Sequence, residues 1–422
     1  MTKKIKIAVI GLGYVGLPVA ICFARKYQVV GYDTSQSRVD ELNNYIDVTN
    51  EISTQELANS LQNNLKISQN KDEIKGCNVY IITVPTPIKS DKSPDLNYLL
   101  EATKMVGELL TLDDIVIYES TVFPGCTEEE CVPLLEKHSK LKFNEDFFCG
   151  YSPERINPGD KNHRIENIVK VTSGSTKIIS EKVDKLYKSV IDAGTFKAES
   201  IKIAEAAKVI ENAQRDINIA FVNELAKIFS KMKIDTNDVL DAASTKWNFL
   251  NFRPGLVGGH CIGVDPYYLS SKSQQLGYNP EIILSGRKVN DEIGEHVAEE
   301  ILELLSKNNH NYKKSKCLIL GATFKENCPD FRNTRVIDII NTLIKNEVNV
   351  DIYDPWVEKK SFSEEYGLNI LNQIPKHKYE AIVLAVSHDC FKEIEISKIR
   401  KKNSIIYDVK GFLDKSIITK RL

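Results

Sequence analysis

The stretch that decides the fold is IKIAVIGLGYVG at residues 5–16. It opens with a β-branched run typical of a buried strand, places glycine at positions 11, 13 and 16, and continues into a helix-like segment. Such glycines permit a tight turn, let backbone N–H groups approach a pyrophosphate and bring the helix close to the strand, while the helix N-terminus favours negative charge. The sequence therefore predicts a dinucleotide-binding turn made by Gly11, Gly13, Tyr14, Val15 and Gly16.

An acidic residue supports this interpretation. Asp33 ends the next expected strand, 17 residues after Gly16. Its carboxylate can accept hydrogen bonds from a ribose diol and would repel a 2′-phosphate, so we expect NAD and not NADP. A G-x-G-x-x-G run alone often only packs a turn, but here strand, glycines, helix, second strand and acid stand in register. Arg38 has three open roles: it lies over the adenine, contacts the ribose region, or stands in solvent on a helix.

The composition describes a globular protein of more than one domain. Its 422 residues exceed a single core at about 150 residues per domain, and 42% are hydrophobic and 27% charged. A net charge of −2 with dispersed basic residues excludes the footprint of a nucleic-acid binder. No apolar run reaches the roughly 20 residues of a membrane span, and the polar first residues are unlike a signal peptide, so we expect a cytoplasmic protein.

Two regions alternate short strand-like runs with helix-like segments, the pattern of βαβ units in a parallel sheet. The expected strands are Ile5–Ile10, Val29–Asp33, Val79–Val84, Ile115–Glu119, Phe147–Tyr151 and Ile168–Thr172 in the first region, and Cys317–Leu320, Val350–Tyr353, Ile382–Val386 and Ile405–Asp408 in the second. Residues 199–232 lack glycine and proline and repeat apolar residues at helical spacing, which predicts one long helix. The expected fold is α/β, with two Rossmann-like doubly wound domains at 1–198 and 309–422 joined by the long helix and a helical domain at 199–308.

A cysteine marks a candidate reactive site. The run GGHCIGVD at residues 258–265 places Cys261 among glycines, with Asp265 at the start of an expected helix. Glycines let a substrate approach the backbone, and a helix N-terminus makes a nearby thiolate more available. An inert buried cysteine is the usual alternative, but apolar residues do not surround this one. The nine cysteines form no C-x-x-C pair and leave an odd one over, which argues against disulfides and structural zinc, and we expect no metal.

Polar residues on the long helix and at strand ends are further candidates. Lys208, Asn212 and Arg215 fall at i, i+4 and i+7 and form one stripe, which is either a solvated face or the border of a cleft where Lys and Asn steady an oxyanion. Thr86 and Thr121 follow expected strands and are candidate contacts to the nicotinamide side, with ordinary turn residues as the equal alternative.

Seven motifs in order resemble the UDP-glucose/GDP-mannose dehydrogenase family over nearly the whole chain: IAVIGLGYVGLPVA, VPTP, ESTVFPG, SPERINPG, AEAAKVIENAQRDINIAFVNE, GGHCIGVDPYYL and FKENCPDFRNT. The resemblance implies a first domain that binds NAD and a last domain that helps hold the nucleotide of a UDP-sugar. It also implies that the long helix links the two halves and forms the core of a homodimer.

The same resemblance implies roles for individual residues. Cys261 corresponds to the nucleophile, Lys208 and Asn212 to the oxyanion-stabilising pair, and Asp265 to a carboxylate that assists proton transfer through water. Thr121 and Glu154 correspond to polar residues of the catalytic cleft, although Glu154 read alone is also compatible with an exposed turn acid. The expected cofactor contacts are Gly11, Gly13, Tyr14, Val15, Gly16, Asp33, Arg38, Thr86, Thr121 and Arg332, and the expected substrate contacts are Glu154, Arg155, Asn157, Lys208, Asn212, Arg215, Arg253, Gly258 and Lys325.

Two positions depart from the UDP-glucose branch of the family, which tends to have an acid at the position of Pro158 and serine at that of His260. SPERINPG and GGHCIGVDPYYL are instead similar to the branch that acts on UDP-N-acetylhexosamines, precursors for surface polysaccharides. The resemblance therefore implies oxidation at C6 of UDP-GlcNAc or UDP-GalNAc to the uronate, through a Cys261 thiohemiacetal and thioester. The alternatives are UDP-glucose or GDP-mannose oxidation and, from another class, a non-catalytic NAD-binding scaffold.

Overall fold

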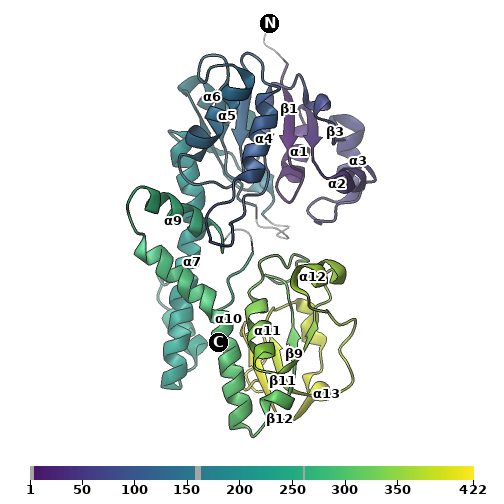
Figure 1. The fold of residues 1–422 in the computed structure, drawn as a ribbon, viewed down its shortest axis with the longest axis vertical. Coiled ribbons are helices and arrows are strands. Elements are labelled where there is room, and N and C mark those ends of the chain that lie inside the picture. The colour runs from purple at the N-terminus through teal and green to yellow at the C-terminus, as the bar shows by residue number, and fades with distance from the viewer. Residues whose placement is uncertain (1–3, 157–162, 260–261) are drawn as a thin grey trace. The chain divides into compact units, whose positions relative to one another are not determined.

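The computed structural model describes residues 4–156, 163–259 and 262–422 (Figure 1). The chain divides into two compact units, each described here by itself. The first consists of Met1–Glu211 with Tyr267–Tyr278, and the second of Asn212–Pro266 with Asn279–Leu422.

The first unit is built on an eight-stranded sheet, counted over the described residues, in the order β3-β2-β1-β4-β5-β6-β7-β8. Its strands are β1 Lys6–Ile10, β2 Gln28–Tyr32, β3 Leu65–Ser68, β4 Val79–Ile82, β5 Ile115–Tyr118, β6 Phe148–Tyr151, β7 Lys170–Gly174 and β8 Thr195–Lys197. The chain runs from β1 outward to β3 and then from β4 outward on the other side, so the order reverses between β1 and β4. Open parallel sheets bind ligands at such a reversal.

Helices cover both faces of this sheet because right-handed crossovers in opposite directions lie on opposite sides. The helices are α1 Gly16–Ala24, α2 Gln36–Asn43, α3 Thr54–Asn63, α4 Asn97–Gly107, α5 Val132–Ser139 and α6 Lys177–Lys188. Helix α1 contacts α3, and α4 contacts α5. Helix α6 lies on the α1 face, where the rings of Phe23 and Tyr187 meet edge to face with centroids 5.2 Å apart.

One strand runs against the expected parallel pattern. Strand β7 pairs antiparallel with β6, through Gly150 with Gly174 and Tyr151 with Ser173. The predicted parallel sheet is confirmed except at this pair, where among the described residues the connection holds only a short 3-10 helix at Ile165–Asn167 and no crossover helix. A return without a crossover helix gives an antiparallel neighbour. The first residue of β7, Lys170, therefore lies beside the C-terminal end of β6.

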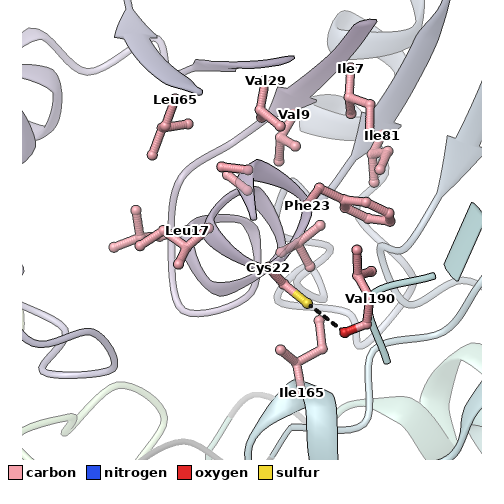
Figure 2. Packing of buried hydrophobic residues seen from close by; sticks show 14 of the residues in the cluster. Ile7, Val9, Leu17, Cys22, Phe23, Val29, Leu65, Ile81, Ile165 and Val190 are labelled. Atoms are coloured by element: carbon pink, nitrogen blue, oxygen red, sulfur yellow. Dashed lines mark hydrogen bonds between the residues drawn. The ribbon is translucent and has the colours of Figure 1, made fainter. Parts of the chain in front are cut away.

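The core of the first unit packs α1 against the sheet (Figure 2). Ile7, Val9, Val29 and Ile81 come from three adjacent strands, and Leu17, Cys22 and Phe23 from α1. The Cys22 thiol donates to the carbonyl oxygen of Val190 at 3.4 Å (Figure 2). Burial raises the pKa of Cys22 to about 12, so this cysteine is a neutral packing residue.

The second unit repeats the architecture with a five-stranded sheet, among its described residues, in the order β10-β9-β11-β12-β13. Neighbouring strands are parallel throughout. The elements are β9 Lys316–Leu320, α11 Val336–Lys345, β10 Asn349–Tyr353, α12 Lys359–Tyr366, β11 Tyr379–Leu384, α13 Ile396–Ile399, β12 Arg400–Asp408 and β13 Lys420–Arg421. Two Rossmann-like sheets are thus present, as the sequence predicts, although the short strands β3, β8 and β13 were not predicted.

Between the two sheets, the described residues form the α-helices α7 Ile201–Met232, α8 Thr236–Ala243, α9 Asp265–Gln275 and α10 Glu281–Lys307. Helix α7 confirms the predicted long helix. In the second unit α7 and α10 are joined by a buried ion pair, with Arg287 Nη1 donating to Asp216 Oδ1 at 2.5 Å and Asn290 donating to the same oxygen at 2.8 Å. None of the described helices combines the length and apolar character that a membrane crossing requires.

Candidate active site

The glycine turn after β1 has the geometry of a dinucleotide site. Gly11 has φ +90°, and its N–H donates to the carbonyl oxygen of Tyr32 at 2.8 Å. The next N–H, of Leu12, donates to Asp33 Oδ2 at 2.8 Å and so ties the turn to the end of β2. At Gly16 a Cβ would lie 1.7 Å from the Gly11 carbonyl oxygen, so only glycine lets α1 start this close to the strand.

The same turn leaves room for a ligand. A Cβ at Gly13 would meet nothing within 4 Å, and Gly13 is exposed at the start of α1. Tyr14 and Val15 beside it are half-buried. Asp33 accepts one backbone N–H on each oxygen, from Leu12 and Ser35, and each oxygen keeps a lone pair for a ribose hydroxyl. These residues fit the pyrophosphate and ribose of a dinucleotide.

Arg38 stabilises the glycine turn by a hydrogen bond to its backbone. This role is not among the three that were expected for it. Its Nε donates to the Leu12 carbonyl oxygen at 2.9 Å, and its Nη2 lies 2.8 Å from Asp47 Oδ1. The side chain is only 11% exposed, so the solvated-helix interpretation was wrong. Its buried Nη1 makes no hydrogen bond within the part of the chain described and lies 3.9 Å from Glu41 Oε2.

The loops after β4 and β5 are joined at their starts. Ser120 Oγ donates to the Val84 carbonyl oxygen at 2.6 Å, which connects the VPTP loop to the ESTVFPG loop. Thr86 and Thr121 are both half-buried in these loops. Both therefore lie at C-terminal strand ends of the sheet, beside the strand-order reversal where ligands bind.

Glu154 belongs to a buried charge cluster after β6. Its Oε1 accepts the backbone N–H of Arg155 at 2.6 Å and that of Ile156, and its Oε2 accepts from Lys170 Nζ at 3.2 Å. Lys170 also donates to Glu119 Oε2 at 2.5 Å. Glu154 is 7% exposed, so the exposed-turn interpretation was wrong. Sequence reasoning missed Lys170 and Glu119, and the signal was a lysine inside the β-branched run IVKVTSG.

Arg155 is held on the same segment. Its guanidinium pairs with Glu211 of α7, with Nη2 2.7 Å from Oε1, and Nη1 donates to the Val169 carbonyl oxygen at 2.9 Å. Asn157, expected beside it, and Pro158 lie outside the described residues.

The three residues of the polar stripe on α7 differ in burial. Lys208 is 6% exposed and Asn212 half-buried, whereas Arg215 is exposed. A solvated face is therefore wrong for Lys208. Asn212 Nδ2 donates to Asp265 Oδ2 at 2.6 Å, and Asp265, the first residue of α9, is 1% exposed. Two of the residues expected in the reaction are thus brought together, and the second N–H of Asn212 is available to donate to a substrate oxygen.

A buried glutamate one turn earlier on α7 was also missed. Glu205 accepts backbone N–H groups from Gly125 at 2.5 Å and Thr127 at 2.9 Å, four and six residues beyond Thr121 in the chain. Burial raises the pKa of Glu205 to about 7, with these hydrogen bonds opposing the shift. Glu205 therefore anchors the loop after β5 to the helix that carries Lys208.

The loop before Cys261 packs against the segment that follows β9. At Gly258 a Cβ would lie 2.4 Å from the Asn333 carbonyl oxygen, and Asn333 Nδ2 donates to the Gly259 carbonyl oxygen at 2.9 Å. The glycine at 258 is thus required by packing, besides any substrate contact. Cys261 and His260 themselves lie outside the described residues.

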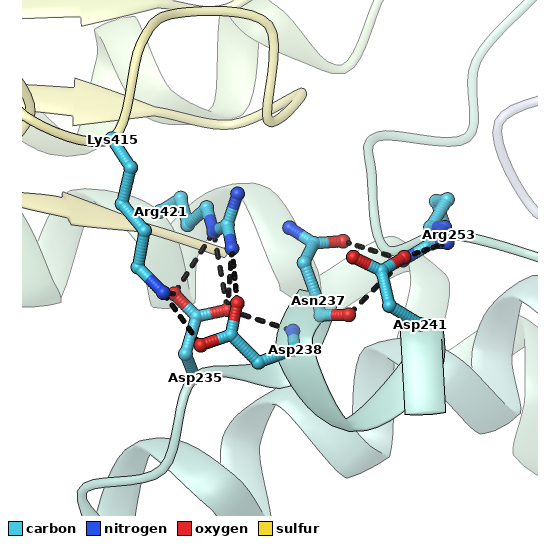
Figure 3. A network of polar contacts seen from close by, with 7 residues as sticks. All are labelled: Asp235, Asn237, Asp238, Asp241, Arg253, Lys415 and Arg421. Carbon is cyan, nitrogen blue, oxygen red and sulfur yellow. Dashed lines mark hydrogen bonds and ion pairs between the residues drawn. The ribbon is translucent and has the colours of Figure 1, made fainter. Parts of the chain in front are cut away.

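Three expected ligand contacts lie in the second unit. Lys325 is half-buried, and its carbonyl oxygen accepts from Thr323 at 2.8 Å. Arg332 is 48% exposed and pairs with Asp330 through Nη2 to Oδ2 at 2.6 Å. Arg253 pairs with Asp241 at 2.5 Å and donates to the Asn237 carbonyl oxygen at 3.3 Å, beside the ion pairs that join Asp235 to Arg421 (Figure 3).

Comparison with known families decides the assignment. The family model of the UDP-glucose/GDP-mannose dehydrogenases matches residues 5–191 with its NAD-binding domain, 202–292 with its central domain and 318–415 with its UDP-binding domain. The chain belongs to this family. It is an NAD-dependent dehydrogenase, and the glycine turn at 11–16 with Asp33 fits the cofactor.

Relatives of this dehydrogenase match it end to end. A UDP-N-acetyl-D-glucosamine 6-dehydrogenase of Salmonella typhi is 56% identical over 413 residues, 97% of each chain. One of Pseudomonas aeruginosa is 54% identical over 415 residues, 98% of each chain. Among solved structures, a UDP-D-ManNAc dehydrogenase from Pyrococcus horikoshii superposes with a TM-score of 0.90 at 31% identity, covering 99% of this chain and 98% of that one.

Two glycine variants separate folding from cofactor binding in this dehydrogenase. In Gly16→Ala the new Cβ clashes with backbone, so we expect a loss of about 1–3 kcal/mol of stability as well as weaker NAD binding. In Gly13→Ala the methyl meets no protein atom but occupies space that the pyrophosphate needs, so stability stays at the wild-type level and the Kd for NAD rises about tenfold or more. Urea unfolding and calorimetric titration measure the two effects, and wild-type NAD affinity in Gly13→Ala would place the cofactor elsewhere.

Proposed function

We propose that this enzyme oxidises the C6 alcohol of a UDP-N-acetylhexosamine, UDP-GlcNAc or UDP-GalNAc, to the carboxylate with two NAD, for surface polysaccharide synthesis in the cytoplasm. The observation that carries the proposal is the identity above 50% with two UDP-N-acetyl-D-glucosamine 6-dehydrogenases over nearly the whole chain. Proline at 158 and histidine at 260 in the motifs SPERINPG and GGHCIGVDPYYL support the same branch. The proposed division is a cofactor domain at 1–198, a helical domain at 199–308 and a UDP-sugar domain at 309–422.

Cys261 explains how one enzyme takes an alcohol beyond the aldehyde. The C6 alcohol first gives up a hydride to NAD and a proton to a base, which leaves an aldehyde. The Cys261 thiolate adds to the aldehyde carbon to form a thiohemiacetal, and loss of a second hydride gives a thioester. Water cleaves the thioester and releases the carboxylate and the thiol, so four electrons leave the sugar and two NADH form.

Lys208, Asn212 and Asp265 are proposed to act on the oxygen atoms of these steps. The ammonium of Lys208 and the second N–H of Asn212 stabilise negative charge as it develops on the C6 oxygen. Asp265, fixed by Asn212 at 2.6 Å, accepts a proton through a water molecule. Glu154 is proposed as a second carboxylate of the reaction, and Thr121 as the source of a hydroxyl. The proposed substrate contacts are Glu154, Arg155, Asn157, Lys208, Asn212, Arg215, Arg253, Gly258 and Lys325.

The proposed assembly is a homodimer through α7. Five large apolar side chains on this helix are between 45% and 58% exposed: Ile203, Ile210, Phe221, Ile228 and Met232. At 3.6 residues per turn they fall within about 40° of one another, so they form a single stripe. Soluble proteins seldom leave such a stripe in water, and a second copy of the chain offers the matching stripe by two-fold symmetry.

A substrate panel tests the function. We expect NADH formation to be fastest with UDP-GlcNAc or UDP-GalNAc, at two NADH per sugar, and slower with UDP-glucose and GDP-mannose. Initial rates by absorbance and the NADH yield at completion measure both expectations. Preference for UDP-glucose or GDP-mannose would contradict the N-acetylhexosamine proposal, and a total lack of NADH would favour a non-catalytic NAD-binding scaffold.

The role of Cys261 is tested by Cys261→Ala. We expect this variant to make no uronate and to bind NAD with the wild-type Kd, because no thioester can form while the glycine turn is unchanged. The exposed Cys390→Ala is the matched control and keeps full activity. Mass spectrometry of the product measures the outcome, and uronate formed by Cys261→Ala at the wild-type rate would exclude the covalent route.

The dimer is tested by placing a charge in the stripe. Phe221→Asp is expected to give a monomer, because the carboxylate would be desolvated in the interface. Lys231→Asp introduces the same residue on the same helix, about 80° away from the stripe, and is expected to stay dimeric. Light scattering coupled to size exclusion measures the mass, and a dimer in Phe221→Asp would place the interface on another surface.

A further inference from the structure

Lys170 is a buried cation that joins two loops of the proposed site. It is 2% exposed, and its Nζ donates to Glu119 Oε2 at 2.5 Å and to Glu154 Oε2 at 3.2 Å. Glu119 directly precedes the Ser120-Thr121 loop after β5, and Glu154 lies in the loop after β6. The antiparallel course of β7 brings Lys170, its first residue, to the edge of the sheet where both loops begin.

The groups around Lys170 include two carboxylates, a tyrosine hydroxyl and an aromatic ring. Tyr187 of α6 donates its hydroxyl to Glu119 Oε1 at 2.5 Å, and its ring lies 5.6 Å from Lys170 Nζ. The Cys22 thiol, from α1, also interacts electrostatically with Lys170 and Glu119 and is neutral, because burial raises its pKa. Burial alone would lower the pKa of Lys170, but the two carboxylates outweigh it and raise that pKa above its ordinary value. Burial raises the pKa of Glu119 above its ordinary value and Lys170 opposes that shift, and with both carboxylates ionised the cluster carries a net charge of −1.

The bonds around Glu154 fix its position as well as its charge. Both backbone N–H groups that follow it, of Arg155 and Ile156, point at Oε1, so the carboxylate is held at one end by its own loop. Lys170 holds the other end. Without the cation, the two carboxylates that contact Lys170 Nζ, those of Glu119 and Glu154, would remain buried without a positive charge between them. Ionised carboxylates that lie close together repel one another, so such a pair shares one proton.

We propose that Lys170 is a positioning residue of the oxidation: it holds Glu154 as a fixed anion in the cleft, joins its loop to that of Thr121, and has Glu119 as its balancing carboxylate. This inference rests on the proposed role of Glu154 in the reaction. The sequence resemblance assigns nothing to Lys170 or Glu119. A merely structural ion pair would change stability alone, whereas a positioning cation also changes how the reaction depends on pH.

The test compares Lys170→Met with the charge-balanced double variant Lys170→Met/Glu119→Gln. The single variant leaves two carboxylates that take up a proton, so kcat is expected to fall roughly 10- to 100-fold, the range that loss of an orienting partner costs at metal sites. The acidic limb of its kcat profile is expected to move up by about one pH unit or more. The double variant leaves one carboxylate and is expected to return that limb to the wild-type position. Lys66→Met removes the same charge from an exposed pair with Glu73 and is expected to leave the profile unchanged.

Two readouts separate this inference from the proposed function. The wild-type substrate panel decides the function by itself. Carboxyl carbon NMR of glutamate-labelled protein, which needs no turnover, is expected to show one extra protonated carboxyl in Lys170→Met near neutral pH and none in the double variant. Absence of that proton, or a wild-type pH profile in an active Lys170→Met enzyme, would overturn the positioning role. A fall in thermal stability alone, equal in both variants, would leave only a structural ion pair.

Discussion

The need to pair buried charges governs this enzyme more than any other constraint. Helix α7 buries Glu205, Lys208, Asp216 and Asn223, each almost fully. A charge taken out of water costs several kcal/mol unless partners replace the solvent. Glu205 therefore takes two backbone N–H groups of the loop after β5, and Asp216 takes Arg287 and Asn290. Each of these pairings holds a segment that is distant in sequence against α7. The buried polar side chains of α7 therefore determine where these segments pack.

A similar turn follows the first strand of each Rossmann-like sheet, β1 in the first unit and β9 in the second, and the two turns differ in their surroundings. After β9, Gly321 has φ +91° and donates to the Tyr353 carbonyl oxygen, and Ala322 N–H donates to Asp354 Oδ2 at 2.7 Å, the arrangement found at Gly11 and Asp33. Yet Asp354 is fully buried, and His388 Nε2 lies 3.1 Å from its Oδ2. Asp33 is half-exposed beside an open turn. The two turns differ in two ways: Thr323 and Glu326 stand where the first turn has Gly13 and Gly16, and the acid of the second turn is buried.

The features that the sequence predicts correctly are those that neighbouring residues in the chain determine. The first strand, the glycine turn, Asp33 and helix α7 could be predicted because periodicity and turn chemistry need only neighbouring residues. Strand β3 was missed because four residues, one a lysine, carry too little pattern. The reversed course of β7, the support that Arg38 gives to the turn and the Lys170 cluster were missed for another reason: they depend on contacts across 16 to 51 residues of chain. Glu154 could be named from its motif, but its partner on β7 could not.

Helix α7 also departs in part from the usual distribution of residues on an amphipathic helix. Its polar residues Lys208 and Asp216 are buried, while Ile210 and Phe221 are more than half exposed. Charge pairing accounts for the buried polar residues, and the exposed apolar residues form a separate stripe, while Val209 and Val222 are buried as in an ordinary amphipathic helix. Exposure of the apolar side chains of the stripe to water is unfavourable, and the proposed dimer would cover them with a second copy of the chain. The proposed catalytic residue Lys208 and the proposed dimer stripe therefore lie on different faces of one helix.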